Sequence, residues 1–197
     1  MVKTKNLLKT LSACAVVLAL GGCGGSDDDG SIVACFTADR TVNFKMKASN
    51  VPSGQVGVSR STVGPMNYGG QNLTGQKFFY TRGSTTYEET NYWRVASNGM
   101  TGVARVNIDG SVKPSSTFYP QDMSPGQIAK DPDNSYSTFI GFETLSLGGK
   151  TFSNTCHFNV VYPDQNVDNT DIWYAPGYAV IKQTYSSGLM SQYDGDL

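Results

Sequence analysis

The feature that most constrains the fold of this chain is the alternation of polar and apolar residues between short turns. It is clearest in Thr41–Ala48, where Val42, Phe44, Met46 and Ala48 alternate with polar residues. Successive side chains of a β-strand point to opposite faces of the sheet, so a period of two predicts a half-buried strand with one wet face.

Turn signals separate the other alternating segments. They are Asn98-Gly99, Asp109-Gly110, Gly148-Gly149 and Pro176-Gly177, and each is a residue pair that tight turns favour. They predict a three-strand meander over about 91–118, a strand ending near 147 and another over about 155–162, and a final hairpin. A single helical turn is expected at 124–131, and a loop with one or two short strands at 50–75. The sequence therefore predicts an all-β fold: a single antiparallel sheet domain, a strongly curved half-barrel or a sandwich, with little or no helix outside the signal peptide.

The N-terminus has the order of a secretory signal. Lys3, Lys5 and Lys9 precede an apolar run that ends at Cys23, and this run is shorter than the roughly 20 residues that span a bilayer. Leu20–Cys23 resembles the lipobox of bacterial lipoproteins, whose cysteine is diacylated and becomes the new N-terminus. We therefore expect a signal peptide at 1–22, a flexible tether at 23–31 and one domain at 32–197. The alternative is an ordinary cleaved signal with a chance cysteine.

The charge balance bears on partners. The chain has 15 Lys and Arg against 16 Asp and Glu, and the expected signal peptide carries away three of the lysines. Nucleic acid is not expected as a partner, because phosphate binding needs clustered Lys and Arg. The expected partners are a membrane, through the lipid on Cys23, and a lipid-like ligand or an envelope protein. The expected location is the cell envelope, and a residue other than aspartate at Gly24 favours the outer membrane if the source is Gram-negative.

The cysteines of the chain indicate a structural role and not a catalytic one. With Cys14 in the signal and Cys23 lipidated, Cys35 and Cys156 remain in an oxidising compartment and are predicted to form a disulfide. Two buried thiols, or a reactive one, are the alternative. His157 adjoins Cys156, but neighbours on a strand point to opposite faces, so this is no nucleophile with its base. No catalytic residue, metal site or cofactor is predicted.

Three weaker candidates remain. Glu143 is expected on a partly apolar face, paired with an arginine or functional. Asp164, Asn166 and Asp168 alternate as at the start of a calcium loop, but the glycine and the bidentate glutamate of such a loop are missing, so a turn is expected instead. The aromatic residues of the strands either form the core or line a ligand-binding face, and the candidates for such a face are Trp93, Trp173 and Tyr174.

The C-terminal part resembles a group of uncharacterised bacterial envelope lipoproteins. The matching positions are Gly141, Glu143, Gly149, Thr151, Phe152, Cys156, Trp173, Tyr174, Ala175, Gly177, Ile181 and Lys182. Two positions depart from the pattern: Lys150 is inserted, and Ala179 stands where a glycine is usual. Some of these proteins are similar to periplasmic lipoprotein carriers, whose half-open barrel holds acyl chains.

The leading hypothesis is non-enzymatic binding of an apolar ligand or an envelope component. The alternatives are a hydrolase using Glu143 or an aspartate near Trp173, and a structural or assembly role.

Overall fold

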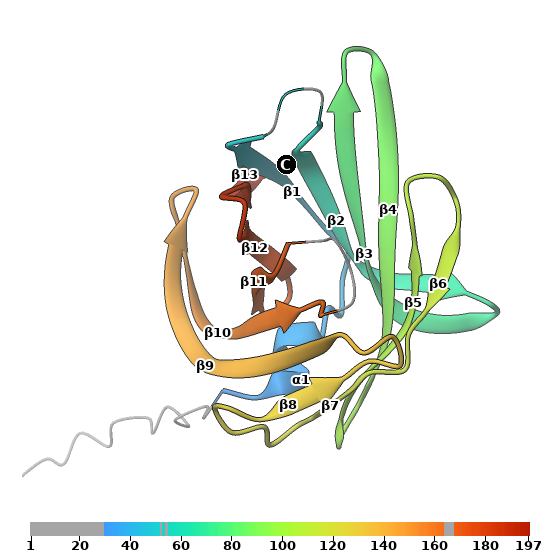
Figure 1. The fold of residues 1–197 in the computed structure, drawn as a ribbon, viewed down its shortest axis with the longest axis vertical. Coiled ribbons are helices and arrows are strands. Elements are labelled where there is room, and N and C mark those ends of the chain that lie inside the picture. Colours follow the sequence, from blue (N-terminus) through green and yellow to red (C-terminus); the bar gives the residue numbers. More distant parts are fainter. Residues whose placement is uncertain (1–29, 52, 54, 164–167) are drawn as a thin grey trace, which may run out of the picture.

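The described part of the chain is one antiparallel sheet with a single short helix. A computed structural model describes residues 30–51, 53, 55–163 and 168–197, and in them it places 13 strands in one sheet (Figure 1). The predicted all-β class with a single curved antiparallel sheet is confirmed. Within these residues no helix is long and apolar enough to cross a membrane.

The elements follow one another as strands joined by short turns. They are α1 (Ile32–Phe36), β1 (Val42–Ser49), β2 (Val58–Tyr68), β3 (Gln71–Arg82), β4 (Thr85–Ala96), β5 (Gly99–Val106), β6 (Val112–Pro114), β7 (Phe118–Pro120), β8 (Ile128–Lys130), β9 (Tyr136–Leu147), β10 (Lys150–Val161), β11 (Thr170–Ala175), β12 (Ala179–Tyr185) and β13 (Met190–Asp196).

Two meanders form the sheet. Its order is β6-β5-β4-β3-β2-β1-β13-β12-β11-β10-β9-β8, and β7 pairs with β5. Strands β1–β7 make the N-terminal half-sheet and β8–β13 the C-terminal half-sheet. The pairing of β1 with β13 joins them, and the ribbon curves until β7 contacts β8 (Figure 1). The two half-sheets therefore face each other across a concave interior.

The helix α1 lies inside this curve and contacts both half-sheets. It packs against β4 and β5 on one side and β10 and β11 on the other (Figure 1). Cys35 is joined to Cys156 of β10 by a disulfide, and Trp93 Nε1 of β4 donates a hydrogen bond of 2.7 Å to the Phe36 carbonyl. A helix of five residues is too short to be stable alone, so these contacts hold it in place.

Aromatic rings fill the core around α1. The Phe36 ring lies 4.4 Å from that of Tyr174 and 6.0 Å from that of Trp93, measured between ring centroids. A second aromatic group, under the junction of β1 and β13, contains Phe44, Phe152, Tyr178 and Tyr193.

The expectation of a loop-rich region at 50–75 was wrong from residue 58 onward, whereas the described residues between β1 and β2 do form a loop. Residues 58–82 form the long hairpin β2–β3, which turns at Gly69 and Gly70, both with positive φ. Polar residues point inward in this hairpin, so its sequence lacks the alternation of polar and apolar residues by which a half-buried strand is recognised. Ser61 and Gln76 are fully buried, and Gln76 Nε2 donates to Ser61 Oγ at 2.9 Å. Ser61 Oγ in turn donates to the Lys77 carbonyl, and the Gln76 amide also bonds the backbone of Val180. Polar side chains whose hydrogen bonds are made can occupy core positions.

Two other expectations need correction. Residues 124–131 contain turns and the short strand β8 instead of a helical turn, whereas the helix found in the structure lies at 32–36. Strand β10 begins at Lys150, ahead of the expected start near 155, because a bulge with positive φ at Asn154 carries the strand through its polar segment. The predicted turns at 109–110, 148–149 and 176–177 lie between strands, and the one at 98–99 lies at the β4–β5 connection, where Asn98 is in the turn and Gly99 begins β5.

Candidate functional site

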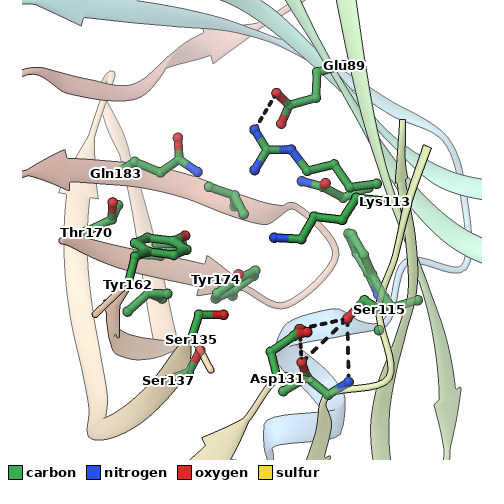
Figure 2. A pocket seen from close by; sticks show the side chains of 18 of the residues that line it. Glu89, Lys113, Ser115, Asp131, Ser135, Ser137, Tyr162, Thr170, Tyr174 and Gln183 are labelled. Atoms are coloured by element: carbon green, nitrogen blue, oxygen red, sulfur yellow. Dashed lines mark hydrogen bonds and ion pairs between the residues drawn. The ribbon is translucent and has the colours of Figure 1, made fainter. Parts of the chain in front are cut away.

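A cavity of about 650 Å³ opens on the concave side of the sheet, above α1. Both half-sheets line it: β3, β4 and β5 on one side, and β10, β11 and β12 on the other. Figure 2 shows side chains converging on this space, with Lys113 facing Tyr162, Tyr174 and Gln183. A volume in the range of roughly 300–1,000 Å³ is typical of small-molecule sites.

The deepest layer of the cavity is apolar and already buried. Trp93, Phe36, Ile172 and Val160 line it, and each is at most 9% exposed. The hydrogen bond from Trp93 to the Phe36 carbonyl fixes the indole in this layer. This buried layer is the floor of the cavity and defines its shape, and the side chains that a ligand could reach lie above it.

Two ion pairs hold the charged side chains of the wall. Arg105 donates to Glu89 with an N–O distance of 2.8 Å, and Glu89 is 8% exposed. Lys113 pairs with Asp133. The hydrogen bond from Lys113, with further ones from Ser135, holds the pKa of Asp133 far below its usual value.

Two further carboxylates in the wall are bonded to hydroxyl groups. Asp131 accepts hydrogen bonds from Thr117 Oγ1 and, at 3.1 Å, from Ser115 Oγ (Figure 2). Asp168 accepts one from Ser186 Oγ at 3.0 Å. Neither makes an ion pair within the described residues. Among the described residues the wall thus carries four carboxylates and two cations, and their excess charge is negative.

Tyrosines make up much of the remaining wall. Burial raises the pKa values of Tyr80, Tyr162 and Tyr174, so these phenols are protonated at neutral pH. Burial also raises the pKa of Tyr119 and of Tyr185, each to about 12. Two hydroxyls have protein partners: that of Tyr119 lies 2.9 Å from Ser137 Oγ, and that of Tyr185 donates to Gln183 Oε1.

The structure separates the sequence-predicted ligand residues. Trp93 and Tyr174 line the cavity, Trp93 in its buried floor. Trp173 lies on the opposite face of the sheet and stacks on His157, with the two ring centroids 4.2 Å apart. Lys182 Nζ lies 4.2 Å from the centroid of the Trp173 ring. Ile172 and Tyr174, on either side of Trp173 in β11, both line the cavity, as expected where successive side chains of a strand point to opposite faces.

The face opposite the cavity also carries His157 and Glu143. His157 Nδ1 lies 2.7 Å from Glu143 Oε1, and Nε2 lies 3.2 Å from Asp171 Oδ1. Burial raises the pKa of Glu143, but hydrogen bonds from Trp173 and His157 outweigh it and leave the pKa below its usual value. The expectation that Glu143 pairs with an arginine was wrong, because its partners are His157 and Trp173 Nε1. Because the two carboxylates lie against opposite nitrogens of one ring, they do not converge on a common substrate position.

The remaining predicted residues have separate positions. The predicted disulfide Cys35–Cys156 is present. Cys23, Asp164 and Asn166 lie outside the described residues. Gly30, near the end of the expected tether, lies so close to Phe142 that a Cβ added to it would meet that ring at 2.4 Å. Within the described residues no group of three His, Cys, Asp or Glu side chains is placed to hold a metal ion.

Sequence reasoning did not find several residues of the wall. Arg105, Lys113 and Asp131 come from different strands or loops, and no spacing in the sequence joins them. A signal was present on β4, where Glu89, Asn91 and Trp93 occupy alternate positions and all line the cavity. A period of two that mixes a carboxylate, an amide and an indole on one inward face indicates a polar interior.

Comparisons with known proteins leave the site to be interpreted from its own residues. No protein-family profile matches the chain, and no curated protein is significantly similar to it. Among solved structures, it is similar to a Bacteroides fragilis protein described as exported and as having a YmcC-like fold. The TM-score is 0.47 and the identity 11%, over 82% of this chain and 98% of that one.

Proposed function

We propose that this protein binds a small molecule in its concave cavity, without catalysis, in the bacterial cell envelope. The cavity itself carries the proposal: about 650 Å³ of space opens between two half-sheets that a helix and a disulfide hold in place. A preformed concave site of this size with a few placed polar groups is the usual form of a small-molecule site.

The state of the polar groups supports binding over catalysis. General bases and nucleophiles need an adjacent activating group aimed at the substrate. Within the described lining there is no histidine or cysteine, and Glu89, Asp133 and Asp131 are each engaged by a cation or by hydroxyl groups. Such groups suit recognition and orientation.

The N-terminal sequence supports the proposed location. Residues 1–23 resemble a lipoprotein signal and its acceptor cysteine, so we propose that Cys23 carries a lipid that anchors the domain to a membrane. The bond between Cys35 and Cys156 fits an oxidising compartment.

A pair of substitutions on β12 tests whether the cavity binds ligands. Gln183 lines the cavity, whereas its neighbour Thr184 does not. We expect the full chain to bind the neutral fluorophore N-phenyl-1-naphthylamine at one site, Gln183→Trp to reduce that binding at least tenfold by filling the space, and Thr184→Trp to preserve it within about twofold. The measurement is fluorescence titration, with circular dichroism to show that both variants are folded. Absence of binding to the unmodified chain, or equal binding by both variants, would exclude the cavity as a site.

A further inference from the structure

The groups that the protein leaves unpaired in this cavity indicate the chemistry of its ligand. Tyr80, Tyr162 and Tyr174 line the space, and none of their phenol hydroxyls has a hydrogen-bond partner among the described residues. They are not sealed in the wall, because the only fully buried side-chain oxygen or nitrogen without a partner in those residues is Ser49 Oγ. The three hydroxyls are therefore available to whatever occupies the cavity.

These hydroxyls come from both half-sheets. Tyr80 lies on β3, whereas Tyr174 lies on β11 and Tyr162 directly follows β10. Figure 2 shows Tyr162 and Tyr174 beside each other, with Ser135, Thr170 and Gln183 around them. A ligand that satisfied all three would bridge the half-sheets and present polar groups in several directions.

The charges of the wall narrow the ligand class. Both cations, Arg105 and Lys113, are already paired with carboxylates. Asp131 and Asp168 leave the described part of the wall with excess negative charge, which disfavours a fatty acid or a phosphate. A cationic ligand would meet Arg105 and Lys113, which are about half exposed and hence at the open side. A neutral ligand avoids both conflicts.

Hydrogen bonding then separates neutral polar ligands from apolar ones. An alkyl chain would displace water from three phenol hydroxyls without forming hydrogen bonds to them, and a buried polar group without a partner is costly in free energy. A ligand hydroxyl can both donate to and accept from a phenol hydroxyl. The tyrosine rings offer flat apolar surfaces to the carbon skeleton of the same molecule.

From these observations we infer that the cavity binds a neutral sugar, free or as the terminal unit of a glycan, through the hydroxyls of Tyr80, Tyr162 and Tyr174. This inference rests on the proposed function, because it assumes that the cavity is a binding site. It replaces the purely apolar ligand of the sequence-based hypothesis with one that has apolar faces and a hydroxylated rim.

The test removes the hydroxyls and keeps the rings. The full chain and its Tyr80→Phe, Tyr162→Phe and Tyr174→Phe variants, single and combined, are titrated with a panel of neutral methyl hexosides and N-acetylhexosaminides, with palmitate as the apolar probe and methylphosphate as the anionic one. Binding is followed directly by saturation-transfer NMR and isothermal calorimetry. Tyr87→Phe is the control, because Tyr87 on β4 is 38% exposed and outside the cavity.

We expect at least one neutral glycoside to bind, the combined variant to weaken it at least tenfold, and Tyr87→Phe to change it less than twofold. The same combined variant should bind N-phenyl-1-naphthylamine at least as tightly as the unmodified chain, because this largely apolar probe does not depend on the phenol hydroxyls. If the combined variant does not fold, the three single variants are compared, and each is expected to weaken the glycoside by threefold or more.

Two results would overturn the inference. One is binding of palmitate that the phenylalanine variants preserve or strengthen; the other is failure of every neutral glycoside to bind. If the naphthylamine probe still binds and is excluded by Gln183→Trp, the sugar assignment fails but the cavity remains a binding site. If the probe does not bind either, the proposed function fails with it.

Discussion

A buried glutamine side chain joins the two half-sheets at a place where no backbone pairing between strands does so. Gln76 of β3 is fully buried, and its amide forms two hydrogen bonds of 2.9 Å with the backbone of Val180 in β12, one as donor and one as acceptor. A neighbouring strand would make the same pair of bonds, and β12 pairs with β13 only over residues 182–184. One amide therefore replaces a missing segment of ladder inside the curve.

Gln76→Ala tests this role. It leaves the Val180 N–H and C=O buried without partners, and each such group costs about 1–3 kcal/mol. We expect the free energy of unfolding to fall by about 2–5 kcal/mol, measured by urea denaturation followed by circular dichroism. Gln121→Ala, at an exposed position, is the control and should lie within about 0.5 kcal/mol of the unmodified chain. Equal midpoints for the two variants would contradict the role given to Gln76.

At the scale of elements, the β9–β10 hairpin is folded back onto β13. Its turn contains Gly148 and Gly149, both at positive φ. A Cβ on Gly148 would meet the Asp194 backbone at 2.8–2.9 Å, whereas a Cβ on Gly149 would have no neighbour within 4 Å. The first glycine is needed for conformation and for close approach, the second for conformation alone.

These adjacent glycines form a matched pair for substitution. Gly149→Ala places a side chain in the left-handed region and should cost about 1–2 kcal/mol. Gly148→Ala adds a clash with backbone and should cost about 1–3 kcal/mol more. Thermal and urea unfolding of the two variants measure the difference. If both are destabilised equally, the approach of the hairpin to β13 contributes nothing to stability.

At the scale of the whole molecule, hydrogen-bonded carboxylates set the response to acid. Lys113 and Ser135 lower the pKa of Asp133, Ser111 lowers that of Asp109, and Ser187 and Ser186 lower that of Asp168. A group whose pKa is lower in the folded state stabilises the fold above its unfolded pKa, and this contribution is lost as the pH falls through the folded value. These aspartates therefore contribute fully at neutral pH and lose their contribution progressively on acidification.

We expect the urea midpoint to be level near neutrality and to fall below a pH of about 5, since unfolded aspartates titrate near 4. Asp133→Asn should reduce the slope of this fall, because it removes the pair with Lys113. Asp122→Asn is the control, since Asp122 is exposed and makes no hydrogen bond or ion pair within the described residues. The midpoint is measured between pH 2.5 and 7, and identical slopes for the two variants would contradict the assignment to Asp133.

Local patterns were sufficient for the parts of this protein that depend on local physics. The period of two predicted β1 with its faces correct, and the turn pairs placed the hairpins, because side-chain direction and turn preference are properties of neighbouring residues. The pairing of Cys35 with Cys156 followed from compartment and number. Patterns failed where polar residues point inward, as at Ser61 and Gln76, because their partners are set by tertiary contacts.

Only the tertiary structure decided which residues share the cavity. Tyr80, Tyr162 and Tyr174 converge because the sheet curves until its two halves face each other, and no spacing in the sequence encodes that curvature. Trp173 and Tyr174 point to opposite faces because neighbours on a strand alternate, and only the curvature of the sheet shows that the face of Tyr174 lines the cavity. By itself the sequence determined the elements and their turns; the site arose from their closure, since it joins residues that are distant along the chain.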